Sequence, residues 1–104
     1  MNAKKEIQKI TEQIVKKYKP EKIILFGSFA YGKSKPSSDI DLLIIKKTNQ
    51  KKVDRIKKVL MMTESNLPLE PLVYNPEEIK ERLSLGDFFF QDIIQKGKVV
   101  YEKK

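Results

Sequence analysis

The sequence Asp-Ile-Asp-Leu-Leu-Ile-Ile at residues 39–45 constrains the fold more than any other segment of the chain. Its last four residues are all apolar, which is typical of a central strand covered on both faces of a sheet. Residues 22–26 are also apolar and β-branched and end at Gly27, so they predict a second buried strand that leads into a tight turn. Both strands need other elements to cover them.

Four segments carry the apolar spacing or the capping residues of helices. They are residues 7–18, 53–65, 76–85 and 88–95, and the third starts with Asn75 as N-cap and Pro76 in its first turn. Two more strands are expected at residues 67–74 and 98–101, and Pro68 and Pro71 favour a sheet edge for the first of them. The sequence thus predicts an α/β (α+β) fold, in which a small mixed sheet of about four strands is covered by helices.

The composition limits the available chemistry. The chain of 104 residues is expected to form one domain, residues 1–104, and it contains no histidine and no cysteine. Catalysis must therefore rest on carboxylates, hydroxyls, lysines or bound hard metals. The N-terminal segment is charged throughout and no apolar stretch is long enough to span a membrane, so we expect a cytoplasmic protein with no membrane association.

The segment around Gly27 and Ser28 is expected to bind phosphate. Glycine lets the backbone approach a ligand closely, and Ser28 is expected to open a helical turn whose unpaired amides and dipole favour phosphate oxygens. Lys33 and Lys35 follow in the same loop, where they either neutralise a triphosphate or are ordinary solvated lysines. The structural alternatives are an N-cap role for Ser28 and a simple turn at Gly27.

Asp39 and Asp41 are predicted to form a metal site. They stand two residues apart on the expected strand, so their side chains project from the same face while Ile40 points the other way. Adjacent carboxylates repel each other unless a cation lies between them, and an all-oxygen ligand set suits magnesium. A magnesium site next to a phosphate cradle indicates a nucleoside triphosphate as ligand.

The pattern apolar-Gly-Ser, about ten residues, then Asp-apolar-Asp-apolar resembles the nucleotidyltransferase superfamily related to DNA polymerase β. The stretch GSFAYGKSKPSSDIDLLI looks most like the minimal, stand-alone members of that family. The resemblance implies that Gly27 and Ser28 bind the triphosphate, and that Asp39 and Asp41 hold two Mg²⁺ ions.

Two further positions matter to the resemblance. A third acid is expected on the strand before the Asn-Pro-Glu-Glu turn, and Glu70 occupies that position, where relatives more often carry Asp. The resemblance implies that Glu70 shares the metal on the acceptor side and serves as the catalytic base; an exposed charge on an edge strand is the alternative. Tyr31 stands where many relatives carry Arg, so this chain lacks that contact to an anion.

The activity implied by the resemblance is transfer of AMP from ATP to a hydroxyl group of a separate macromolecule. Minimal members often pair with a small helical toxin of the HEPN ribonuclease type, so a tyrosine of such a toxin is the expected acceptor, with this chain as its antitoxin. The alternative is an antitoxin that neutralises its partner by binding alone. A basic module that binds nucleic acid is the weaker third interpretation.

Two surface features bear on partners. Between Lys46 and Lys58 there are seven basic residues and one acid, a face that attracts nucleic acid or an acidic protein, although a solvated helix face is the favoured interpretation. Phe88, Phe89 and Phe90 cannot all face one core, so at least one ring is expected to be exposed or docked. These aromatics suggest an interface with a partner or with another copy of the chain.

Overall fold

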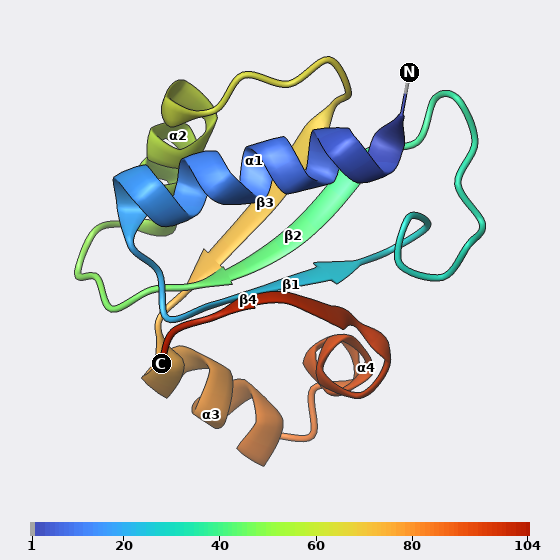
Figure 1. Cartoon of the computed structure of the whole chain (residues 1–104). Helices are drawn as coiled ribbons and strands as arrows, with labels where there is room; N and C mark the ends of the chain where they lie inside the picture. Colours follow the sequence, from blue (N-terminus) through green and yellow to red (C-terminus); the bar gives the residue numbers. More distant parts are fainter. Residues whose placement is uncertain (1) are drawn as a thin grey trace.

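The chain forms one four-stranded sheet with two helices against each face (Figure 1). The structure is a computed structural model that describes residues 2–104. Its elements are, in order, α1 (Ala3–Tyr18), β1 (Lys22–Phe26), β2 (Ile40–Ile45), α2 (Lys52–Met62), β3 (Leu69–Tyr74), α3 (Pro76–Ser84), α4 (Phe88–Lys96) and β4 (Lys98–Glu102). Every helix and strand expected from the sequence is present, with small shifts at the ends.

The strand order is β3-β2-β1-β4, and the sheet is mixed. β1 runs antiparallel to both β2 and β4, whereas β2 and β3 are parallel. The predicted mixed sheet and the predicted edge position of the proline-containing strand are therefore confirmed. This order also brings the end of β1 and the starts of β2 and β3 to the same end of the sheet.

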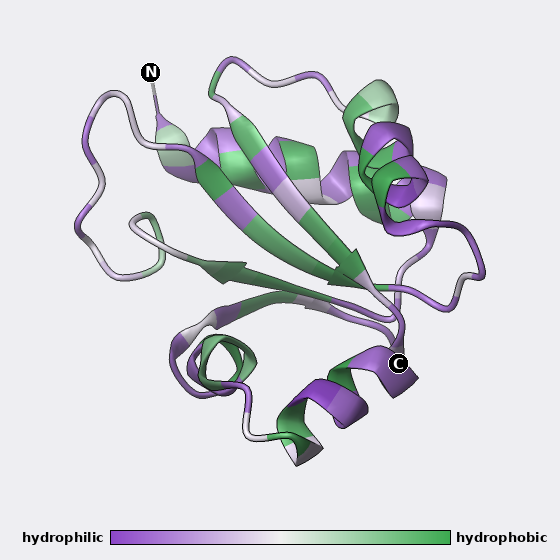
Figure 2. Ribbon diagram, turned by 180° about the vertical axis from the view of Figure 1, so that it is seen from behind, coloured by the Kyte–Doolittle hydropathy of each residue, from purple (hydrophilic) through white to green (hydrophobic). Residues whose placement is uncertain are grey.

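Two apolar layers hold the helices onto the sheet (Figure 2). On one face, Ile10 and Ile14 of α1 and Val59 of α2 pack on alternate strand residues such as Leu42. On the other face, helices α3 and α4 pack on the intervening strand residues, through Ile79, Phe90, Ile93, Ile24 and Leu43. Strand β2 is covered on both sides, as its apolar run predicts.

The β4 edge of the sheet is irregular. Ile23 of β1 pairs with Tyr101 and Ile24 pairs with Val99, so the register shifts and Val100 has no partner in β1. This geometry is that of a β-bulge, which increases the local twist of an edge strand.

Arg55 links three elements in the interior. Its side chain bonds the Glu78 carboxylate of α3, with Nη1 to Oε1 at 2.7 Å, and it also donates to the carbonyls of Val73 and Gln50. Arg55 is 4% exposed, so the expectation that it belongs to a basic outer face is wrong. The helical spacing of α2 places Arg55 next to the exposed basic residues. Its hydrogen bonds to the Glu78 carboxylate and the Val73 carbonyl, however, turn its side chain into the interior.

No helix among residues 2–104 combines the length and the apolarity that a membrane crossing requires.

Candidate active site

The register of the sheet places Asp41 between Phe26 of β1 and Glu70 of β3. Residues that pair across neighbouring strands project from the same face, so the side chains of Asp41 and Glu70 emerge side by side. They lie on the face that carries α3 and α4, because they share the alternation of Leu43 and Leu72. Figure 2 shows the matching hydrophilic bands across β2 and β3.

Asp41 is held in an unfavourable electrostatic environment. Burial raises the pKa of its carboxyl above the ordinary value of 3.8, and the negative charges of Asp39 and Glu70 raise it further. Asp39 and Glu70 therefore both lie close enough to Asp41 to act on its carboxyl. Asp39 is half-buried just before β2 starts, and Glu70 is exposed on the edge strand.

Gly27 brings the end of β1 against this carboxylate. A Cβ atom at position 27 would lie 2.1 Å from Oδ2 of Asp41, so any other residue would force the carboxylate out of its present position. The residue also has a φ of +75°, which L side chains rarely adopt. The backbone expected to receive phosphate thus touches the carboxylate expected to hold metal.

The segment after Gly27 is a turn, and the expectation of a helix N-terminus at Ser28 is wrong in this respect. The amides of Ala30 and Tyr31 donate to the Gly27 carbonyl at 3.0 and 3.2 Å, and the Lys33 amide donates to the Ser28 carbonyl at 2.9 Å. Within residues 2–104 no helix follows from this turn, and the next regular element is β2. The dipole of a full helix therefore does not contribute to the phosphate site expected here.

The predicted phosphate-side lysines lie on the loop that connects the turn to Asp39. Lys33 and Lys35 are both exposed. The Lys35 amide donates to Oγ of Ser38 at 2.7 Å, and the Ser38 amide donates back to the Lys35 carbonyl at 2.9 Å. These bonds fold the loop locally, while the lysine side chains remain in solvent.

The carboxylates fit magnesium by their chemistry. All donors are oxygen atoms, and a cation would relieve the repulsion that raises the pKa of Asp41. In the described part of the chain, however, no three acidic side chains are already grouped closely enough to hold one ion. Asp39, Asp41 and Glu70 would therefore have to draw together around a metal.

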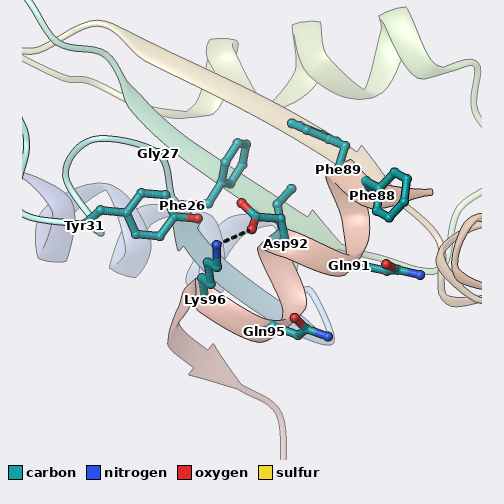
Figure 3. Close-up of a pocket in the computed structure, with 10 residues that line it drawn as sticks. Phe26, Gly27, Tyr31, Phe88, Phe89, Gln91, Asp92, Gln95 and Lys96 are labelled. Carbon is teal, nitrogen blue, oxygen red and sulfur yellow. Dashed lines mark ion pairs between the residues drawn. The ribbon is translucent and has the colours of Figure 1, made fainter. Parts of the chain in front are cut away.

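Sequence reasoning missed a groove beside Gly27. It lies between the turn and helix α4 and is lined by Phe26, Tyr31, Phe89, Asp92 and Lys96 among others (Figure 3). The Phe88-Phe89-Phe90 run signals an exposed aromatic at the start of this helix. Asp92 and Lys96 give no signal in the sequence, because polar residues on a helix usually face solvent.

Three comparisons with known proteins agree with this geometry. The family model described as "Polymerase beta, Nucleotidyltransferase" matches residues 8–104. A protein of Methanocaldococcus jannaschii named "Putative protein adenylyltransferase" is 29% identical over 104 residues, which cover 97% of this chain and 100% of that protein. A crystal structure described as a "putative nucleotidyltransferase from Sulfolobus solfataricus" superposes with a TM-score of 0.67 at 22% identity, over 95% of this chain and 79% of that one, and shows the same fold.

Proposed function

Because the chain belongs to the polymerase β nucleotidyltransferase family, we propose that it transfers AMP from ATP, in a magnesium-dependent reaction, to a hydroxyl group of a partner protein. One observation carries the proposal. Asp41 lies between Glu70 on one side and the backbone of Gly27 on the other, so the carboxylates proposed to hold metal adjoin the turn proposed to bind phosphate.

The residues divide the work by their positions. Asp39, Asp41 and Glu70 would hold two Mg²⁺ ions, which when bound stabilise charge on the attacking and leaving oxygens. The amides near Gly27 and the hydroxyl of Ser28 bind the triphosphate. Lys33 and Lys35 neutralise the pyrophosphate that leaves.

In this proposal Glu70 acts as the base, because it emerges from β3 beside Asp41. The acceptor oxygen forms a bond to the α-phosphorus, the bond from that phosphorus to the bridging oxygen breaks, and the hydroxyl proton passes to the carboxylate of Glu70. The exposure of Glu70 at the outer strand suits this role, because a large acceptor can reach it there.

A protein is the acceptor that we propose, and specifically a tyrosine of a HEPN-type toxin that this chain neutralises. The similar archaeal protein is named as a putative protein adenylyltransferase. Phe88, at 84% exposed, offers an apolar contact for such a partner on the face that carries Asp41 and Glu70.

The test uses mass spectrometry of the partner after incubation with Mg-ATP. We expect an AMP adduct with the unaltered chain and with Asp54→Asn, a change on the exposed face of α2. We expect no adduct with Asp41→Asn or when EDTA removes the metal. If Asp41→Asn still neutralises the toxin and no variant yields an adduct, the chain acts by binding alone.

The structure gives less support than the sequence to nucleic-acid binding by the basic face of α2. Arg55, which could pair with a phosphate through two hydrogen bonds, is buried against Glu78. A nucleic-acid role would require binding to RNA or DNA that weakens steeply with salt and does not depend on Mg²⁺ or nucleotide.

A further inference from the structure

The groove between the turn after β1 and helix α4 adjoins the candidate active site (Figure 3). Its volume is about 620 Å³, and Gly27 belongs to its lining. The backbone of Gly27 is also the element that approaches the Asp41 carboxylate. A ligand bound at the carboxylates can therefore continue into this groove.

The strand order indicates which reactant is close to the groove. Glu70 lies on β3, on one side of Asp41, whereas Gly27 follows β1 on the other side. The proton acceptor and the incoming hydroxyl thus belong to the β3 side. The groove lies on the β1 side, next to the turn proposed to bind phosphate. The rest of the nucleotide can therefore extend from the phosphates into the groove.

The groove offers flat apolar surfaces. Tyr31 is 38% exposed and Phe89 is 50% exposed, although both are large aromatic residues. Phe26 also lines the groove, and its ring meets that of Phe89 edge to face with the ring centroids 5.8 Å apart. Aromatic surfaces of this kind stack with nucleobases of any type.

The groove also contains a hydrogen-bond acceptor and a hydrogen-bond donor. Asp92 and Lys96 of α4 form an ion pair at 3.1 Å, and Figure 3 shows it opposite the ring of Tyr31. The side chains of Asp92 and Lys96 are 49% and 68% exposed, and an exposed pair of this type contributes little to stability. It can therefore open at low cost and present a hydrogen-bond acceptor and a donor to the edge of a base or to ribose hydroxyls.

From these observations we infer that the groove binds the nucleoside part of the triphosphate. Tyr31 stacks on the base, and Asp92 and Lys96 contact its polar edge or the ribose. This inference rests on the proposed function for the placement of the phosphates, and it adds the site that distinguishes a nucleotide from a bare polyphosphate.

The chain contains no tryptophan, so Tyr31→Trp introduces a single fluorescent reporter in the groove. The probes are α,β-methylene-ATP, which cannot transfer AMP, and inorganic tripolyphosphate, each with Mg²⁺. We expect the ATP analogue to quench the reporter and tripolyphosphate to leave it unchanged. The matched control is Tyr101→Trp in β4, which packs against the core on the α1 side and should not be quenched.

Calorimetry of the unaltered chain and of Tyr31→Ala gives the second measurement. The ATP analogue should bind the unaltered chain about 10-fold more tightly than tripolyphosphate does, and Tyr31→Ala should remove most of this difference while Tyr31→Phe keeps it. The affinity for tripolyphosphate should be the same in all three proteins, which also shows that the variants are folded.

The outcomes separate this inference from the proposed function. Equal affinities for the two probes, or an undiminished preference in Tyr31→Ala, would overturn the nucleoside site and leave the phosphate and metal site intact. If neither probe binds the unaltered chain, both the nucleoside site and the proposed function are wrong.

Discussion

Asp41 is a carboxylate whose charge opposes folding. Burial and the charges of Asp39 and Glu70 raise its pKa above 3.8, the value expected in the unfolded chain. A group with a raised pKa favours the folded state below its unfolded pKa, and this contribution is lost as the pH rises through the folded value. At neutral pH the ionised Asp41 therefore lowers the stability of the metal-free protein.

Replacing this charge should consequently stabilise the fold. We expect Asp41→Asn to raise the melting temperature at pH 7 without Mg²⁺ by up to ~4 °C, because the amide is neutral and of the same size. The gain should disappear near pH 3.5, where Asp41 is protonated, in thermal melts followed by circular dichroism. Asp54→Asn should instead cause a small decrease at pH 7, since Asp54 lies in the first turn of α2, near the positive end of the helix dipole. A lower melting temperature for Asp41→Asn at neutral pH would contradict this account.

Gly27 should be intolerant of any side chain. Gly27→Ala introduces a Cβ at 2.1 Å from Oδ2 of Asp41 in addition to an unfavourable φ. Gly86→Ala is the matched control, because it has a similar φ of +74° but no atom within 4 Å of the new Cβ. We expect urea unfolding to show a loss of about 1 kcal/mol for Gly86→Ala, from the backbone conformation alone, and a clearly larger loss for Gly27→Ala. Equal losses in the two variants would show that the contact with Asp41 has no energetic weight.

At the scale of elements, Arg55 joins α2, β3 and α3 through one guanidinium group. Burial alone would raise the pKa of Glu78, but the hydrogen bond from Arg55 and that from the Asn75 amide hold it below 4.5. The stabilising contribution of this carboxylate is present above pH 4.5 and is lost as the pH falls through its lowered pKa. Its pH dependence is therefore opposite in sign to that of Asp41.

Removal of the guanidinium should be costly. We expect Arg55→Ala to lower the free energy of unfolding at pH 7 by about 3 kcal/mol, because Glu78 and the Val73 carbonyl lose a buried donor. Arg55→Lys should recover only part of the loss, since an ammonium group cannot make two parallel bonds to a carboxylate. Urea denaturation measures both, and a change below ~0.5 kcal/mol in Arg55→Ala would refute a structural role for this residue.

The elements were predictable because their signals are local. Asn75 and Asp87 cap the helices that follow them, and the apolar run after Asp41 identifies the central strand. Arg55 was misplaced because its partner, Glu78, is 23 residues away in the sequence, so helical spacing alone could not reveal it. A helix was wrongly expected to start at Ser28, because a glycine and a serine that follow a strand can begin either a turn or a helix.

In the candidate site, too, local sequence patterns predict some features, whereas others depend on contacts between distant residues. The closeness of Asp39 and Asp41 follows from strand alternation, whereas the position of Glu70 beside Asp41 depends on the parallel register of β2 and β3. The groove at Tyr31 depends on how α4 packs across the sheet from a segment more than 50 residues earlier. Contacts of this range leave no pattern in a single sequence.

At the scale of the whole molecule, a formal net charge of +8 surrounds a small apolar patch. Phe88 and Leu85 are 84% and 73% exposed at the junction of α3 and α4, whereas Phe90 is buried. The expectation that the three phenylalanines cannot share one core is thus confirmed. Like charges oppose association of two copies, and salt screens that repulsion without weakening apolar contact.

Self-association through this patch should therefore increase with ionic strength. We expect sedimentation velocity to show more dimer in high than in low sodium chloride for the unaltered chain, and only monomer for Phe88→Ser. The variant should retain the melting temperature, because the exposed ring makes little contribution to the core. If both proteins are monomeric at every salt concentration, the patch does not mediate self-association and remains available for contact with a different protein.

The two edges of the sheet are protected in different ways. Pro71 removes one amide from the β3 edge, and the bulge at Val100 breaks the regular spacing of the β4 edge. Neither edge is a good template for adding strands from another molecule, so the protein should resist growth into amyloid fibrils even when concentrated. A cell could then accumulate this chain at high concentration without assembly through either sheet edge.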